Sequence, residues 1–192
     1  MSKILFFDSE TTGLIPKGIN YREHYEQYPY IVQLSWEFDG ELKDFIIKPE
    51  DWYVPVSSTE IHGISHEKAL AEGHNFNDVI VEFINDCQKA DTIIGFNMYF
   101  DTSIIKANII RAMPDAFVDL SDCALSKDKR LDLMFKTIKF VGARKENGSG
   151  KFPTLIELYN KLFNEEFPAH NSAEDVKATK RCYEELKERG VI

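Results

Sequence analysis

An apolar run that ends in two carboxylates constrains the fold of this chain more than any other feature. Residues 4–7 have the composition of a buried strand, and Asp8 and Glu10 follow at its polar end. Side chains two residues apart on a strand point to the same face, so both carboxylates are expected to face one place. Two unpaired negative charges there would repel each other, and a hard divalent cation, which prefers carboxylate oxygens, would remove that conflict. The run therefore predicts a buried strand that carries half of a metal site.

The segments that follow predict an α/β fold with a mixed sheet. Residues 30–38 and 42–47 are rich in apolar and aromatic side chains and flank Asp39-Gly40, a pair typical of a two-residue hairpin turn. They should form an antiparallel meander with the first strand. Further strands are expected at 92–96 and 116–120. The expected helices cover residues 57–66, 77–90, 101–113, 153–163 and 172–189. This order indicates a sheet with helices on its faces.

Composition favours a globular intracellular chain. Hydrophobic side chains make up 43% of the 192 residues, enough for a substantial core, and we expect one domain over residues 1–192. No apolar run reaches the roughly 18 residues of a membrane span, and the chain begins with a strand rather than a signal peptide. Cys87, Cys123 and Cys182 are widely spaced and lack metal-ligand pairing, which favours free thiols in a reducing compartment. We therefore expect a cytoplasmic protein without a membrane partner.

Charge is distributed unevenly along the chain. Residues 127–151 hold eight basic and three acidic side chains, whereas the whole chain carries a net charge of −9. A basic segment on an acidic body can steer phosphates locally while non-specific binding to nucleic acid stays weak. An ordinary solvated surface explains the same composition equally well. The connection over residues 15–29 is long and carries three tyrosines, and long loops often shape active sites. An ordered surface excursion is equally compatible with it.

Two later segments carry polar residues that could complete the metal site. Asp101 is expected where the predicted strand 92–96 leads into a helix, and open α/β sheets commonly bind ligands at such strand ends. Further along, His170 should lie just before the last helix and Asp175 within its first turns. Each residue also has an ordinary explanation, because an acidic side chain in a helix's first turn favours the helix dipole. A histidine before a helix is usually a surface or capping residue.

Taken together, the three segments resemble the DEDDh family of 3′→5′ exonucleases, which includes the proofreading subunit of bacterial replicative DNA polymerases and ribonuclease T. The matching motifs are Asp-x-Glu-Thr-Thr-Gly-Leu at 8–14, Asn-x-x-Phe-Asp at 97–101 and His-x-x-x-x-Asp at 170–175, with a weaker match at 61–64. Three motifs in the correct order and spacing are stronger evidence than any one alone. The resemblance implies a ribonuclease H-like fold and the release of nucleoside 5′-monophosphates from a nucleic-acid 3′ end.

The resemblance also implies roles for individual residues. Asp8, Glu10, Asp101 and Asp175 would hold two Mg²⁺ or Mn²⁺ ions, and His170 would be the general base that takes a proton from the attacking water. The implied substrate contacts are Ser9, Thr11, Thr12, Gly13, Leu14, His62, Asn97 and Phe100. Among them, Leu14 is expected to wedge against the terminal base. Simple core packing remains the alternative for Leu14 and for Phe100, and a structural role remains equally open for His62.

The expected substrate is a single-stranded DNA 3′ end. One alternative is an exoribonuclease that trims RNA 3′ ends, because discrimination depends on how the pocket treats a 2′-hydroxyl and no residue decides this. The other is a catalytically inactive nucleic-acid-binding or polymerase-associated module on the same fold. The four carboxylates argue against an inactive module, since acidic clusters repel phosphate unless metal is bound. No tail follows the predicted last helix, so a polymerase partner is not expected.

Overall fold

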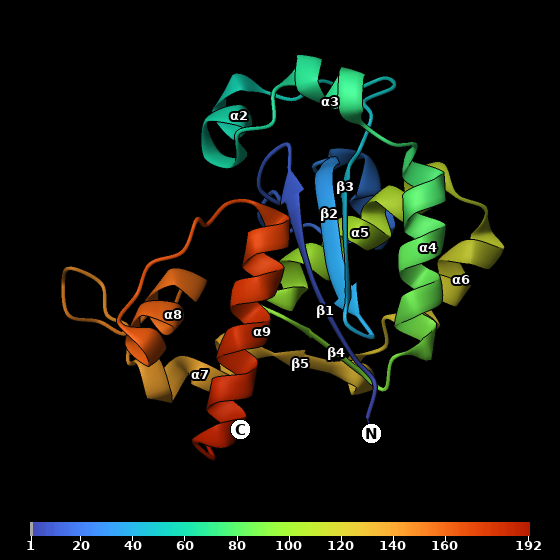
Figure 1. The fold of residues 1–192 in the computed structure, drawn as a ribbon. Coiled ribbons are helices and arrows are strands. Elements are labelled where there is room, and N and C mark those ends of the chain that lie inside the picture. Colours follow the sequence, from blue (N-terminus) through green and yellow to red (C-terminus); the bar gives the residue numbers. More distant parts are fainter. Residues whose placement is uncertain (1) are drawn as a thin grey trace.

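The computed structural model describes residues 2–192 and contains a five-stranded mixed sheet in the order β3-β2-β1-β4-β5 (Figure 1). The strands are β1 (Ile4–Thr11), β2 (Ile31–Phe38), β3 (Glu41–Ile46), β4 (Thr92–Gly95) and β5 (Arg130–Asp132). β1 pairs antiparallel with β2 and parallel with β4, β2 pairs antiparallel with β3, and β4 pairs parallel with β5. The Asp39-Gly40 turn between β2 and β3 has positive φ at both residues, as the sequence predicts. The expected α/β fold with an antiparallel meander and parallel strands is confirmed.

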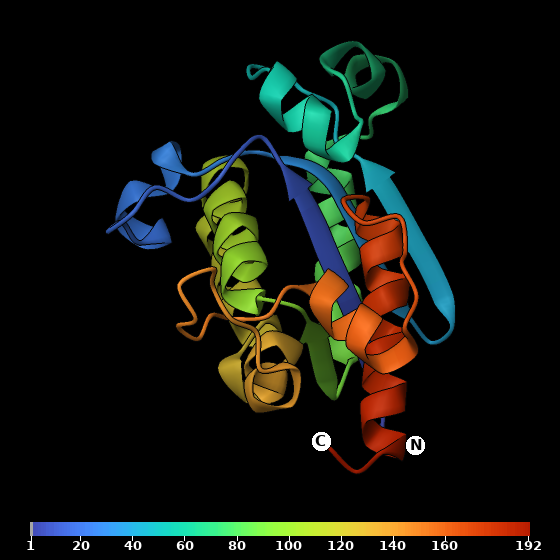
Figure 2. The ribbon, with the colours of Figure 1, turned by 90° about the vertical axis from the view of Figure 1, so that its left-hand side faces the viewer.

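Helices cover both faces of this sheet (Figures 1 and 2). They are α1 (Tyr21–His24), α2 (Val56–His62), α3 (His66–Glu72), α4 (Phe76–Lys89), α5 (Met98–Ala112), α6 (Asp115–Ala124), α7 (Leu133–Val141), α8 (Leu155–Phe163) and α9 (Ser172–Glu188). Two short 3₁₀ turns, η1 (Tyr25–Gln27) and η2 (Lys127–Lys129), follow α1 and precede β5. Among residues 2–192, no helix combines the length and apolar character that crossing a membrane requires.

The alternation of side chains along β1 builds a core on each face of the sheet. Leu5 and Phe7 are buried against α4, α5 and α6, with Phe83 packing its ring on Phe7. Phe6 points to the opposite face and joins a second core with Leu158 of α8 and Val176 of α9. β1 is therefore fixed from both sides, and the residues that continue it are held in a rigid position.

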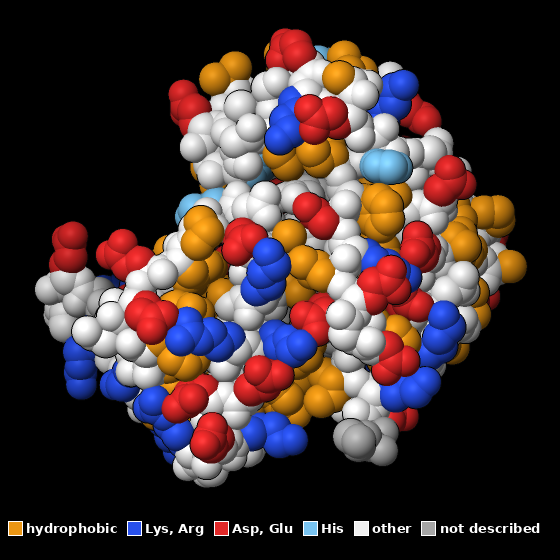
Figure 3. Space-filling view, in the orientation of Figure 1, with side chains coloured by type: hydrophobic (Ala, Val, Ile, Leu, Met, Phe, Trp, Pro, Cys, Tyr) orange, Lys and Arg blue, Asp and Glu red, His pale blue; other side chains and the backbone are white. Residues whose placement is uncertain are grey.

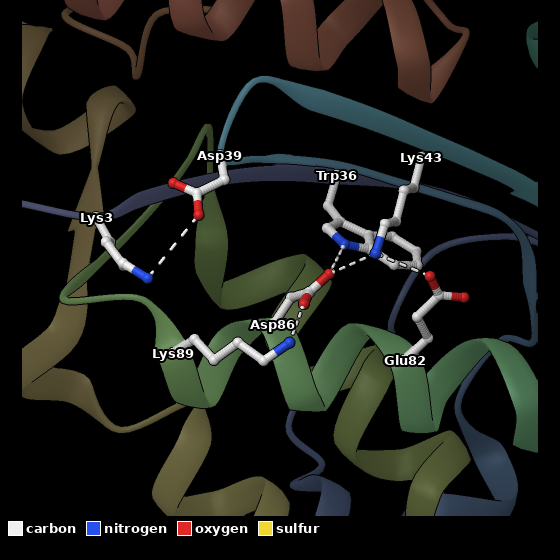
Figure 4. Close-up of polar contacts among 7 residues, drawn as sticks. All are labelled: Lys3, Trp36, Asp39, Lys43, Glu82, Asp86 and Lys89. Carbon is white, nitrogen blue, oxygen red and sulfur yellow. Dashed lines mark hydrogen bonds and ion pairs between the residues drawn. The ribbon is translucent and has the colours of Figure 1, made fainter.

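A buried carboxylate, Asp86, joins the β2–β3 hairpin to α4 (Figure 4). Its carboxylate oxygens accept hydrogen bonds from Trp36 Nε1 at 3.0 Å, Lys43 Nζ at 2.8 Å and Lys89 Nζ at 2.9 Å. Burial alone would raise the pKa of Asp86, but the donors from Lys43, Trp36 and Lys89 outweigh burial and lower it. Lys43 also pairs with Glu82 at 2.8 Å. A buried charge with several donors is well compensated, so this contact fixes the hairpin on the helix.

Two predictions of secondary structure are wrong. Residues 116–120 are not the last strand but lie inside α6, because Pro114 occupies the N-cap and Asp115 stands in the helix's first turn. The last strand is β5, only three residues long. The helix predicted over 57–66 is two helices, since α2 ends at Gly63 with a φ of 74° and Ser65 caps α3. The three cysteines are free, as predicted.

A candidate active site at the carboxyl end of β1

Carboxylates from three elements converge at the end of β1. Asp8 and Glu10 project from the strand, and Asp175 projects from the first turn of α9. One oxygen from each of these three carboxylates lies within 4.8 Å of the others. Asp101, in the first turn of α5, is only 5% exposed, and its Oδ1 accepts a hydrogen bond from Ser9 Oγ at 2.7 Å. The structure therefore brings three of the four predicted metal ligands together, and Asp101, held by Ser9, lies near enough for its charge to raise the pKa of Asp8 and Glu10.

Burial raises the pKa of every carboxylate in the cluster, and for Asp8 and Glu10 the neighbouring cluster charges add to it. Burial, followed by the negative charges of Asp175 and Asp101, raises the pKa of Glu10 to about 8. Burial raises the pKa of Asp101 to about 7 and that of Asp175 to about 6, although hydrogen bonds from Ser9 and from the His170 backbone oppose this. The pKa of Asp8 is also well above its usual value, through burial and the other three carboxylates. An all-carboxylate site that must hold protons near neutral pH fits hard divalent cations.

The start of α9 sets the positions of His170 and Asp175. His170 has a φ of 67° and its side chain is exposed, while its backbone N–H donates to Asp175 Oδ2 at 3.0 Å. The side chain of Asn171 then caps the helix by accepting from the backbone of Glu174. This left-handed residue turns the chain into the helix, so the histidine lies beside the carboxylate cluster as predicted. Its charge is close enough to lower the pKa of Asp175.

Buried polar residues of β2 attach α9 to the sheet, and the sequence analysis missed them. Gln33 and Ser35 lie on β2 directly opposite Glu10 and Asp8. The backbone N–H of Ser172 donates to Gln33 Oε1 at 3.3 Å, and the hydroxyls of Ser35 and Ser172 are hydrogen-bonded to each other. The only sequence signal for this contact is the presence of polar residues in an otherwise apolar strand.

The segment after Glu10 is held at its base and open at its tip. Thr11 Oγ1 donates to the Gly13 carbonyl at 2.7 Å, and Thr12 Oγ1 accepts from the Tyr30 backbone N–H at 2.9 Å. Leu14 is 84% exposed, which excludes core packing as its role. Exposed large apolar side chains next to a polar site are candidates for ligand contact. The structure thus supports a contact role for Leu14 rather than the alternative.

Phe100 and Asn97 lie across from this segment. Together with Leu14 they line a cavity of about 370 Å³. Phe100 is partly buried and packs against the core, so core packing explains part of its position. Asn97 is exposed, has a left-handed φ of 62°, and its side chain makes no capping hydrogen bond to α5. Its amide group is therefore free to contact a ligand.

His62 reaches the same end of the sheet from the last turn of α2. It is 7% exposed, and its Nδ1 accepts a hydrogen bond from the Ile64 backbone N–H at 3.1 Å. Burial lowers the pKa of His62, and the backbone of Thr11 opposes this only in part. A neutral imidazole with an accepting Nδ1 carries its proton on Nε2, and that atom is buried near the Thr11 backbone but has no acceptor within hydrogen-bonding geometry. An unused buried donor of this kind fits a ligand acceptor.

Asp132 is a further positioning residue that the sequence analysis missed. Its Oδ1 accepts from the backbone N–H groups of Asn97 and Met134, each at 3.0 Å, and its Oδ2 accepts from Met98 N at 2.8 Å. One carboxylate thereby joins the N-termini of α5 and α7, and so fixes the helix that carries Asp101. The signal that could have revealed it is an aspartate directly before an apolar helical segment, a typical N-cap.

Comparison with known proteins settles the family. The family model of the ribonuclease T type, described as an exonuclease, matches residues 5–183, a range that contains every residue of the candidate site. The chain belongs to this exonuclease family. The resemblance to this exonuclease family that the three motifs indicate is thereby confirmed. No curated protein sequence matches the exonuclease domain closely enough to be counted as a relative.

Solved structures share the fold of this exonuclease domain at low sequence identity. E. coli exonuclease I in complex with a dA16 oligonucleotide matches with a TM-score of 0.75 at 22% identity, over 98% of this chain and 41% of the other. The zinc-bound form of its complex with single-stranded DNA matches with a TM-score of 0.74 at 24% identity, over the same shares. A product-bound exonuclease I matches with a TM-score of 0.73 at 21% identity, over 99% and 45%. The domain thus spans less than half the length of these proteins.

Proposed function

We propose that this chain is a metal-dependent exonuclease that releases nucleoside 5′-monophosphates from the 3′ end of single-stranded DNA. The observation that carries the proposal is the convergence of Asp8, Glu10 and Asp175 within 4.8 Å, with Asp101 beside them, in a member of an exonuclease family. The complexes of E. coli exonuclease I with DNA oligonucleotides support the choice of substrate. The family match over residues 5–183 supports one exonuclease domain over residues 1–192.

The four carboxylates would hold two Mg²⁺ or Mn²⁺ ions. Bound there, such ions supply an activated water and stabilise the negative charge of the leaving 3′-oxygen. The donor set consists of oxygen atoms alone, which suits these cations, and the raised pKa values of the buried carboxylates support a bound positive charge. Ser9 holds the Asp101 carboxylate in place, and the cap of α9 does the same for Asp175.

His170 is the proposed general base. Its imidazole is exposed beside the cluster, where it can accept a proton from an attacking water. The backbone hydrogen bond from His170 to Asp175 keeps the two residues together, so the carboxylate stabilises the imidazolium that forms. The unusual φ of 67° at His170 fixes the direction from which its side chain leaves the backbone.

The terminal nucleotide is proposed to bind between the segment after Glu10 and the start of α5. Leu14 would wedge against its base, while Phe100 and the free amide of Asn97 complete the pocket. The backbone around residues 11–13 would hold the nucleotide, and the Nε2–H of His62 would donate to a sugar or phosphate oxygen. Contacts of this kind ignore base identity, which fits removal of nucleotides without sequence preference.

A degradation assay tests the proposal. The protein is incubated with 5′-labelled single-stranded DNA, double-stranded DNA and RNA, in Mg²⁺, Mn²⁺ or EDTA, next to an Asp8→Asn variant. We expect a ladder that shortens from the 3′ end of single-stranded DNA, released nucleoside 5′-monophosphates, and no activity in EDTA or in the variant. No metal-dependent shortening of any substrate would refute the exonuclease. A ladder confined to RNA would replace the DNA substrate by RNA.

A further inference from the structure

A groove leads from the candidate active site along one side of α5. The cavity lined by Leu14, Asn97 and Phe100 adjoins a second cavity of about 510 Å³, and Tyr99 lines both. Tyr99, Ser103 and Lys106 lie three or four residues apart and share one face of α5. The second cavity is thus a continuation of the first, one to two helical turns further from the carboxylates.

The long connection over residues 15–29 forms one wall of this groove. Its helix α1 lies alongside α5, as Figure 2 shows for the blue segment beside the yellow-green helix. Asn20 caps α1 by accepting from the backbone of Arg22 and Glu23. The ring of Tyr21 then lies 5.7 Å from the cationic groups of Arg22 and of Lys106. The tyrosine-rich loop is therefore an ordered part of the groove.

The opposite wall comes from the start of the basic segment 127–151. Lys127 and Arg130 line the second cavity together with Arg22 and Lys106, and Asp122 is the sole carboxylate among its lining residues. Asp122 pairs with Lys106 at 2.7 Å and also with Arg22. Lys127 and Arg130 are left without an ion pair, as no carboxylate of residues 2–192 lies within pairing distance of either.

Arg130 is the strongest sign that the groove takes an anion. Its guanidinium is half-buried, its Nη1 donates to Thr102 Oγ1 at 3.0 Å, and its Nε is buried without a partner. Asp122 and Asp132 act on this charge only from beyond ion-pair distance, so a bound anion would supply the direct partner that the buried Nε lacks. The outer face of α9 has no comparable cluster of basic side chains, because basic and acidic side chains are interspersed there (Figure 3).

We propose that this groove binds the phosphodiester backbone of the strand whose 3′ end lies at the carboxylates. This inference rests on the proposed function. Arg130 and Lys127 hold phosphates on the 5′ side of the scissile bond, and the ring of Tyr99, which is 63% exposed, offers a stacking surface for an unpaired base. The groove would thus select single strands and keep them bound during successive cleavages.

Substrate length separates this role from a role in catalysis. A dinucleotide contains only the scissile phosphate, whereas an oligothymidine of about a dozen nucleotides also has phosphates that reach the groove. We expect Arg130→Gln to lower kcat/KM about tenfold for the long substrate and to leave the dinucleotide unchanged. The slope of log KM against log salt concentration should decrease by roughly 0.7 for each phosphate contact that the substitution removes. Lys127→Gln, at an exposed residue without a side-chain hydrogen bond or ion pair, should show the same pattern more weakly.

Controls keep the two proposals distinguishable. Lys187→Gln removes an exposed cation of α9 and should leave kcat/KM unchanged for both substrates. Equal losses of kcat/KM on both substrates, or no loss with either groove variant, would overturn the proposed groove. Neither result would contradict the proposed exonuclease activity. If the wild-type protein degrades nothing, fluorescence anisotropy of the oligothymidine in EDTA still tests the groove. Loss of inhibition by inorganic phosphate in Arg130→Gln, with unchanged oligothymidine affinity, would show a small-anion site instead and overturn the proposal.

Discussion

Replacing one cluster carboxylate by its neutral amide should stabilise the metal-free protein. The pKa of Glu10 lies at about 8 instead of 4.5, so its ionisation opposes folding wherever the unfolded chain is charged and the folded protein is not. At about 1.4 kcal/mol per pKa unit, this amounts to roughly 3 kcal/mol at pH 7. Because Glu10 keeps some contact with solvent, we expect about 2 kcal/mol from Glu10→Gln, a rise in Tm of roughly 4–8 °C for a chain of this size.

The pH dependence gives this prediction its sign. Below about pH 4 the carboxyl is protonated in both states, so wild type and Glu10→Gln should be equally stable. As the pH rises toward 8, both proteins lose stability in EDTA because Asp8, Asp101 and Asp175 still titrate, but the wild type loses more because it also ionises Glu10. Saturating Mg²⁺ should restore the stability of the wild type, since a ligand that binds only the folded state stabilises that state. It should raise the stability of the variant by less.

Urea unfolding in EDTA at pH 4, 7 and 8, followed by circular dichroism, measures these differences. Glu184→Gln on the exposed side of α9 is the matched control and should change nothing at any pH. If Glu10→Gln is no more stable than wild type at pH 8, burial and the neighbouring charges do not raise the pKa of Glu10 as inferred. A gain that persists unchanged at pH 4 would point to better packing rather than to charge.

Three further variants test other parts of the site. His170→Ala should lower kcat by about a hundredfold or more while metal still raises Tm, and lost metal stabilisation would mean that the histidine acts on the cluster instead. Leu14→Ala should leave Tm unchanged and raise KM, because the side chain is exposed; a large fall in Tm would contradict this. Asp132→Asn should lower stability by about 1–3 kcal/mol, since an amide has one oxygen for three N–H donors, and should lower kcat through displacement of Asp101. Unchanged unfolding would refute that positioning role.

Site residues that belong to one short segment with a clear residue pattern could be predicted from the sequence. Asp8 and Glu10 follow an apolar run, and strand periodicity alone places them on one face. Asp101 and Asp175 needed motif order, because nothing local indicates that the starts of two helices meet at that strand. The hairpin at Asp39-Gly40 was predictable because positive φ at both turn residues has a known residue preference.

What depends on contacts between distant segments could not be predicted. β5 is three residues long in a charged segment, and it is a strand only because β4 offers it a hydrogen-bonding edge. Because β5 was not predicted, the role of Asp132 in joining the N-termini of α5 and α7 could not be predicted either. The run over 116–120 contains apolar side chains suited to a strand, and the helix boundary at Pro114 was the signal that outweighed them. The partners of Arg130 likewise come from segments remote in sequence.

The order of the proposed metal ligands along the chain has a consequence for synthesis. Asp8 and Glu10 lie in the first strand, while Asp175 lies in α9, which packs across β1 and β2 (Figure 1). A ribosome adds about 5–20 residues per second, so the early strands leave the exit tunnel seconds before α9 does. Until that helix docks, the carboxylate cluster lacks one member and its histidine. Under the proposed function, a nascent chain would therefore lack a complete metal site until α9 has docked.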